Sequence, residues 1–266
     1  MCHEGYQKIS MVELTKEQKR AVKLAQRPRR THIDIACVLH GNAYDWIYVE
    51  RLHNMVQRNL DLPVTMHVWT EHDRSVPPHM VKHILDDWPG ISGPKKSWWY
   101  KMQMFDPKHH AGDLLYLDLD VIVCKSLNWV LENTNNVVWT LRDFRYLYDP
   151  KSDRMNSSLL WWNVPEMSWI WDSWNAKPPR LWANQYHGDQ DFLFHTLGHN
   201  RRRYYNDQLA QSWRWSAHDG GWDFKRRRSI APGTGTKIAD STSLLVFHGR
   251  PKPHQIKDPL VKTLWR

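Results

Sequence analysis

Short apolar segments and helical segments alternate through the first half of the chain, and this order constrains the fold more than any other feature. Residues 33–40 have the pattern of a buried strand, residues 44–60 carry apolar side chains at helical spacing, and residues 63–70 alternate as a second strand. We expect a helix over 78–87, and a short helix over 101–105 ahead of the apolar strand that begins at Leu114. This order is typical of an α/β fold in which helices flank an open, Rossmann-like sheet.

The second half of the chain continues the pattern after a basic N-terminal segment. Further strands are predicted at 137–141, 158–163 and 243–248, with helices at 165–175 and 188–197. A separate helix is predicted at 12–26, followed by basic residues up to position 30. Because 266 residues suit one large domain with a small appendage, we predict an N-terminal helix and linker at 1–30 and one α/β domain at 31–266.

Charge and cysteine content narrow the class of protein. The net charge is +9, with basic clusters at 27–30, 201–203 and 225–228, which indicates an anionic partner or a solvated basic surface. No apolar run approaches the roughly 20 residues of a membrane span, and no apolar signal segment follows the first methionine. The three cysteines are scattered, so we expect a reduced, cytoplasmic protein. Neither a GxGxxG nor a Walker A sequence is present, which argues against a dinucleotide or P-loop enzyme.

Two aspartates interrupt the apolar run LLYLDLDVIV at 114–123. Alternation along a strand would put Asp118 and Asp120 on one side, where unpaired ionised carboxylates are costly to bury. In wound α/β sheets, ligands bind beyond the carboxyl ends of the strands. We therefore expect His40, at the end of the first strand, to face the same crevice as the two aspartates, with a cation between the carboxylates. The alternative is a strand-end turn with solvated carboxylates.

Four segments together resemble glycosyltransferase family 8. They are the Asp-x-Asp pair, MNSSLLWWN at 155–163, GDQD at 188–191 and FHGRPKP at 247–253, and they occur in the order seen in that family. The chain departs from the family pattern at Ser158, where glycine is usual, and at His248 and Gly249, which are adjacent instead of separated by two residues. The resemblance implies a GT-A fold, with a central mixed sheet flanked by helices. It also implies metal-dependent transfer of a sugar from a nucleoside-diphosphate sugar, most readily a UDP-sugar.

The resemblance assigns roles to individual residues. It implies that the metal ligands are Asp118, Asp120 and His248. Mixed carboxylate and imidazole ligation suits Mn²⁺ better than Mg²⁺, although either ion remains an option. The donor nucleotide and its diphosphate would be bound by His40, Lys101, Asp118, Arg250 and Lys252.

The resemblance also places three residues at the reacting sugar. Asn156, Asp189 and Gln190 would contact the sugar or lie near its anomeric carbon, and Gln190 would face that carbon if the enzyme retains configuration. An inverting base is not singled out, and Asp191, Asp219 and Asp223 remain candidates. The structural alternatives are a helix-capping role for Asp189, a turn at Asn156, a purely structural His248, and a solvated surface for Lys101 and Arg250.

The acceptor stays open at this point. A glycan or another hydroxyl acceptor is one option, with the basic clusters touching an anionic membrane surface. A phage-type glycosyltransferase of nucleic-acid bases is another, because tryptophans 213, 215 and 222 lie between two basic clusters and could stack on bases of DNA. A non-catalytic module that binds a nucleotide sugar or a nucleic acid is the third.

Overall fold

The computed structural model describes residue 15 and residues 30–132, 136–231, 233 and 235–266. The chain divides into two units, Met1–Arg30 and Thr31–Arg266, and nearly all described residues belong to the second. The helix predicted at 12–26 and most of the basic cluster at 27–30 lie outside the described residues, so they stay predictions.

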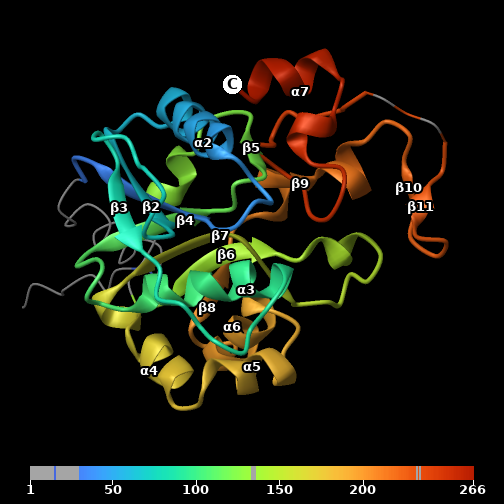
Figure 1. Ribbon diagram of the computed structural model, residues 1–266. Helices are drawn as coiled ribbons and strands as arrows, with labels where there is room; N and C mark the ends of the chain where they lie inside the picture. Colours follow the sequence, from blue (N-terminus) through green and yellow to red (C-terminus); the bar gives the residue numbers. More distant parts are fainter. Residues whose placement is uncertain (1–14, 16–29, 133–135, 232, 234) are drawn as a thin grey trace, which may run out of the picture. The chain divides into compact units, whose positions relative to one another are not determined.

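A seven-stranded mixed sheet forms the centre of the second unit, in the order β3-β2-β1-β4-β7-β6-β8 (Figure 1). β7 runs antiparallel to both of its neighbours, β4 and β6, whereas every other neighbouring pair is parallel. The strands are β1 (Ile33–Leu39), β2 (Val64–Thr70), β3 (Val81–Ile84), β4 (Asp113–Leu117), β6 (Val138–Arg142), β7 (Met155–Asn163) and β8 (Arg202–Tyr204). The mixed α/β sheet predicted from the sequence is confirmed.

A second, three-stranded sheet places distant segments beside the end of β4. Its order is β5 (Val121–Val123), β12 (Leu244–Val246) and β9 (Ala210–Ser212), and β12 pairs antiparallel with β5. Residues 118–120 connect β4 to β5, so the Asp-x-Asp pair lies in the connection between the two sheets. The loop that follows β12 is thereby brought next to the same pair. A small hairpin, β10 (Trp222–Asp223) and β11 (Arg228–Ser229), lies apart from both sheets.

Helices cover both faces of the main sheet (Figure 1). One face packs against α2, whose apolar side chains meet Ile35 and Leu39 of β1. The opposite face packs Ala36 and Trp69 against a second, tryptophan-rich core that includes residues of α4 and α6. The helices are α2 (Trp46–Asn59), α3 (Pro94–Trp99), α4 (Trp169–Asn175), α5 (Pro179–Gln185), α6 (Asp189–Leu197) and α7 (Pro259–Leu264). Short 3₁₀-helices are η1 (Tyr100–Phe105), η2 (Asn128–Glu132), η3 (Phe144–Leu147), η4 (Pro165–Met167), η5 (Asp207–Leu209) and η7 (Pro253–Gln255), and η6 (Trp213–Ala217) is a π-helix.

Two local predictions are wrong. Residues 78–87 do not form a helix, because β3 occupies Val81–Ile84 and pairs with β2. Without β3, the edge of β2 would expose a row of unpaired backbone groups, and β-branched side chains suit the short strand that covers it. The run at 114–123 is not one strand either. β4 ends at Leu117, and Asp118 and Asp120 lie in the connection to β5, so strand alternation does not set their orientation.

Candidate active site

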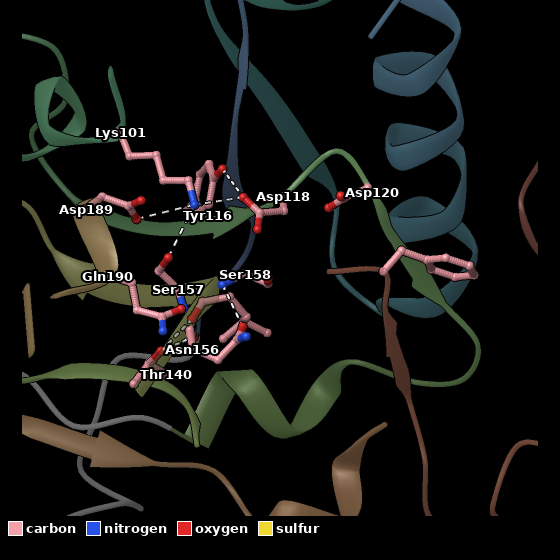
Figure 2. Close-up of polar contacts among 12 residues, drawn as sticks. Lys101, Tyr116, Asp118, Asp120, Thr140, Asn156, Ser157, Ser158, Asp189 and Gln190 are labelled. Carbon is pink, nitrogen blue, oxygen red and sulfur yellow. Dashed lines mark hydrogen bonds and ion pairs between the residues drawn. The ribbon is translucent and has the colours of Figure 1, made fainter. Parts of the chain in front are cut away.

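Lys101 is the centre of the polar cluster beyond the carboxyl end of β4 (Figure 2). It lies in η1 and only 9% of its side chain is exposed. Its Nζ lies 2.9 Å from Oδ1 of Asp118, 3.3 Å from Oδ2 of Asp189 and 3.3 Å from Oγ of Ser157. One buried ammonium group therefore links the Asp-x-Asp pair to the start of α6 and to β7, three segments that are far apart in the sequence.

Asp120 has different partners from Asp118. The hydroxyl of Tyr44 donates to Oδ2 of Asp120 at 2.8 Å, and the ammonium of Lys252 forms an ion pair with the same oxygen. Lys252 also donates to the carbonyl oxygen of Phe247, at 3.3 Å. Asp120 is thus attached to the loop after β12, whereas Asp118 is attached to Lys101.

The two carboxyl groups differ in electrostatics as well. Burial alone would raise the pKa of Asp118, but the charge of Lys101 and a hydrogen bond from Tyr116, at 2.5 Å, hold it below its ordinary value. Burial and the neighbouring charge of Asp118 raise the pKa of Asp120, although Lys252 and Tyr44 act against this rise. Negative charge at Asp120 is therefore incompletely compensated, which is the condition under which a carboxylate binds a further cation.

Three residues predicted to lie at the sugar surround this cluster. Asp189 is the first residue of α6, whose N-cap is Gly188, so Asp189 does not occupy the capping position. Burial raises the pKa of Asp189 more than Lys101 lowers it. The side chain of Gln190 accepts a hydrogen bond from the backbone N–H of Ser157 and donates to Asp143, both at 3.2 Å. Asn156, on β7, accepts from the backbone N–H of Ser158 at 3.0 Å.

The other predicted residues lie at varying positions around the cluster. His40 contacts Oγ of Ser97 at 2.9 Å and packs edge-on against Tyr100. Arg250 is exposed and lies two residues before Lys252 in the same loop. His248 contacts Oγ of Ser212 through Nε2 at 2.6 Å, and burial followed by the charges of Arg214 and Lys252 lowers its pKa to about 4.

His248 does not join the two aspartates in this structure. Over the described part of the chain, the ligand atoms of His248, Asp118 and Asp120 do not form a group within 4.8 Å of one another. The adjacency of His248 and Gly249, where the family has two intervening residues, is the sequence signal that this loop is built differently.

Sequence reasoning missed three residues of the site. Tyr116 and Tyr44 bind the two aspartates, and Asp143 binds Gln190. Asp143 directly follows β6, which runs in the same direction as β4, so the rule that polar residues gather at carboxyl strand ends could have found it. Nothing in the local sequence marks Tyr44, which is 76 residues away from Asp120.

The three candidates for an inverting base have partners of their own in the structure. Asp191 forms an ion pair with Arg154. Asp223 accepts from the backbone N–H groups of Lys225 and Arg226, which stabilises the hairpin turn. The backbone N–H of Asp219 donates to the carbonyl of Gly235 at 3.1 Å.

The fold is that of the GT-A glycosyltransferases. No protein-family model matches the sequence, and no curated protein matches it either. Among solved structures, the chain is similar to the galactosyltransferase LgtC in complex with donor and acceptor sugar analogues, with a TM-score of 0.58, 15% identity and coverage of 88% of this chain and 97% of LgtC. It is also similar to GlyE of Streptococcus pneumoniae TIGR4, with a TM-score of 0.60, 16% identity and coverage of 88% of this chain and 60% of GlyE.

A third similar structure is mouse xyloside xylosyltransferase 1, with a TM-score of 0.50, 12% identity and coverage of 83% of this chain and all of that chain. These matches confirm the GT-A fold that the sequence motifs implied. Over the described residues, no helix is long and apolar enough to cross a membrane.

Proposed function

We propose that this chain is a metal-dependent glycosyltransferase that moves a sugar from a nucleoside-diphosphate sugar, preferentially a UDP-sugar, to a hydroxyl group of a glycan. The observation that carries the proposal is the ion-paired trio of Lys101, Asp118 and Asp189 at the carboxyl end of β4. It joins two of the family-like motifs through one buried cation, in a fold shared with galactosyl- and xylosyltransferases.

The charges of the cluster suit a divalent cation. Lys101 and Lys252 offset two of the three carboxylates Asp118, Asp120 and Asp189, so the group carries a net charge of −1 when all five are ionised. The Lys252 ammonium already rests against Asp120, which demonstrates that this carboxylate attracts a cation. We assign the metal to Asp118 and Asp120, with His248 as the proposed third ligand, where Mn²⁺ or Mg²⁺ would act as a Lewis acid for the departing diphosphate.

Lys252 and Arg250 provide positive charge for the diphosphate from the same loop. Because 23% of the Lys252 side chain is exposed, its ammonium can exchange Asp120 for diphosphate oxygens. Lys101 is too buried and too firmly paired for this role. We propose instead that it positions Asp118 and Asp189, which revises the diphosphate contact expected from the sequence.

Asp189 and Gln190 are placed to bind the donor sugar. Oδ2 of Asp189 is buried, and no donor reaches it with hydrogen-bond geometry among the described residues. Its ion pair with Lys101, at 3.3 Å, supplies charge but not hydrogen-bond geometry, and a sugar hydroxyl would add the hydrogen bond that this buried acceptor lacks. Gln190 is fixed by Ser157 and Asp143. An active-site glutamine-to-glutamate mutant of LgtC has been crystallised, and we propose that Gln190 faces the anomeric carbon here.

A cavity beside the Arg250 loop suits an acceptor. Its volume is about 480 Å³, and its wall includes Trp213, Arg214, Trp222 and Arg250. Tryptophan faces and arginines together bind sugar rings and their polar substituents. The complex of LgtC with donor and acceptor sugar analogues supports a glycan as the class of acceptor for this chain.

The basic clusters give less support to a nucleic-acid acceptor. Arg202 is buried and donates to the carbonyls of Phe194 and Gly198, and Arg203 donates to backbone carbonyls as well. Of the basic clusters within the described residues, the one at 225–228, in the exposed β10–β11 turn, remains available for DNA or for an anionic membrane surface.

A panel of nucleoside-diphosphate sugars tests the proposal directly. The chain is incubated with each donor and Mn²⁺, and release of the nucleoside diphosphate is measured with and without a mixture of oligosaccharide acceptors. We expect release from one donor, which stops when the metal is chelated. Binding of a nucleotide sugar with no release in any combination would instead favour the non-catalytic module.

A further inference from the structure

A second cluster of ligating side chains lies at the opposite end of β4 from the candidate active site. It consists of Asp34 on β1, His67 on β2 and His110 in the loop before β4, whose ligand atoms all lie within 4.8 Å of one another. Asp34 stands beside Leu114 in the sheet, as the pairing of Ile35 with Leu115 shows. Since Asp118 follows four residues later, the two clusters are separated by about 13 Å along the strand. They are therefore independent sites.

Two imidazole nitrogens converge on one carboxylate in this cluster. Nε2 of His67 lies 3.1 Å from Oδ1 of Asp34, and Nε2 of His110 lies 3.6 Å from Oδ2 of the same residue. The carbonyl oxygen of Asp113 lies 3.1 Å from Nε2 of His110. Only 9%, 11% and 17% of the side chains of His67, His110 and Asp34 are exposed. In a tetrahedral zinc site with bonds of about 2.0–2.1 Å, neighbouring ligand atoms stand roughly 3.3–3.4 Å apart. The two nitrogen–oxygen distances of 3.1 and 3.6 Å, each to a different oxygen of Asp34, lie near this value.

Further histidines surround the cluster in the way that supporting groups surround metal ligands. Nδ1 of His67 lies 2.9 Å from Nε2 of His83, and this hydrogen bond fixes the orientation of the His67 ring, whose other nitrogen faces Asp34. His32 contacts Oδ2 of Asp34 at 3.2 Å. With His109 beside His83, five of the sixteen histidines of the chain gather here.

We propose that Asp34, His67 and His110 bind one Zn²⁺ ion, or a divalent transition metal of similar preference, as a structural site. Two imidazoles and a carboxylate favour zinc over manganese or magnesium, which prefer oxygen ligands. The ligands come from two neighbouring strands and from the loop that enters β4, so the metal would fasten that loop to the sheet. The site is separate from the proposed Mn²⁺ or Mg²⁺ site and takes no part in sugar transfer.

A metal-free hydrogen-bond network is the competing explanation, and the choice of substitution separates the two. Glutamine places an amide N–H close to the position of histidine Nε2, so His67→Gln and His110→Gln retain a donor toward Asp34 but bind zinc poorly. Asp34→Asn removes the anionic ligand. His53→Gln is the matched control, because His53 as a whole residue is 9% exposed, compared with 7% for the whole of His67. The ring of His53 also packs near another histidine, His79. Asp120→Asn is the control for the other carboxylate site.

The experiment uses the full chain without a histidine tag, stripped with a chelator that is then removed. Zinc is titrated against a chromophoric competitor, and the unfolding temperature is recorded with and without zinc. We expect one zinc equivalent, an increase in unfolding temperature of about 5–10 °C at zinc concentrations about 100-fold above Kd, and no comparable response to Mn²⁺. The Asp34, His67 and His110 variants should each bind at least about tenfold more weakly, while the His53 and Asp120 variants bind as the parent does.

The absence of a stoichiometric zinc site in the parent would overturn the proposal. So would binding within twofold of the parent in both glutamine variants, or a loss confined to Asp120→Asn, which would place the zinc at the other site. If a variant does not fold, zinc-edge X-ray absorption of the parent decides the question. About two imidazole ligands support the site, and an all-oxygen shell excludes it.

Discussion

Asp118 and Asp120 are two residues apart, yet they belong to two regions of opposite character. Asp118 faces a closed region, where Lys101 and Tyr116 bind its carboxylate and keep its pKa below the ordinary value. Asp120 is the more buried of the two side chains, but it faces what we call the open region, where burial and the charge of Asp118 raise its pKa and its cationic partner, Lys252, is 23% exposed, compared with 9% for Lys101. The ion pairs of the closed region are internal, whereas the lysine of the open region is within reach of solvent, as its proposed exchange of partners requires.

Because of this difference, we expect Lys101 to contribute mainly to stability and Lys252 mainly to ligand binding. Removing the buried Lys101 should damage the fold, because it leaves the buried Asp189 and also Asp118 without a cation. Removing Lys252 should cost less stability, because only one carboxylate, Asp120, loses its cation and 23% of the Lys252 side chain is exposed. Its larger effect should be on ligand binding. The following predictions test whether the two regions differ in this way.

The largest effect is expected for Asp120→Asn. This substitution retains the shape of the side chain but removes the charge that a divalent cation needs, so turnover should fall by about 10³-fold or more. Release of nucleoside diphosphate in saturating Mn²⁺ measures the loss, and circular dichroism checks the fold. Equal activity of the variant and the parent would show that Asp120 is not a metal ligand.

Lys101→Met should destabilise the protein by about 3–5 kcal/mol, because Asp118 and Asp189 would then be buried without a countercharge. Urea unfolding measures the change. Lys108→Met is the control, since Lys108 also pairs with two carboxylates, Asp86 and Asp106, but 55% of its side chain is exposed. The control should change stability by no more than about 1 kcal/mol. A similar loss in both variants would remove the distinction between the closed and open regions.

Asp189→Asn should lower sugar transfer by about 100-fold and leave the affinity for the nucleoside diphosphate unchanged, because Oδ2 of Asp189, which accepts no hydrogen bond among the described residues, is proposed to bind a sugar hydroxyl. Calorimetry with the diphosphate and a transfer assay give the two quantities. Asp191→Asn is the neighbouring control. If only the control lost turnover, Asp191 would become the inverting base and Asp189 a structural residue.

His248→Gln should raise the Mn²⁺ concentration needed for half-maximal activity by about 10–100-fold, if the imidazole completes the metal site. A metal titration of the parent and the variant at constant donor concentration measures the shift. Titration curves that coincide would assign His248 to its contact with Ser212 alone, as an anchor of the loop after β12.

The smallest effect is expected for Lys252→Met. Stability should fall by about 1–2 kcal/mol, less than for Lys101→Met, because one carboxylate instead of two loses its cation. The apparent affinity for the nucleoside diphosphate should fall about tenfold, because one charged hydrogen bond is lost. Isothermal calorimetry and thermal unfolding provide both values. A loss of stability as large as that of Lys101→Met would mean that Lys252 belongs to the closed region.

Much of the fold and half of the site could be predicted because the signals are local. The apolar strand pattern at 33–40 and the helical spacing at 44–60 correspond to β1 and α2 within one or two residues at each end. The Asp-x-Asp pair and Asp189 were recognised from motifs that span only a few residues. β3 was missed because its strand is stabilised by the edge of β2, which the sequence of 78–87 does not reveal.

The sequence by itself determined the order of strands and helices, the polar ends of the strands and the identity of the chemical groups, since each depends on residues that are close together in the chain. Only the tertiary structure decided which of these groups meet. Lys252 lies 132 residues from Asp120, and Tyr44 lies 76 residues from it. Lys252 reaches Asp120 because β12, which precedes the Lys252 loop, pairs with β5 in the second sheet. Tyr44 reaches Asp120 because β1, which precedes Tyr44, pairs with β4 in the main sheet. Long-range pairing depends on packing between elements and has no local signal in the sequence.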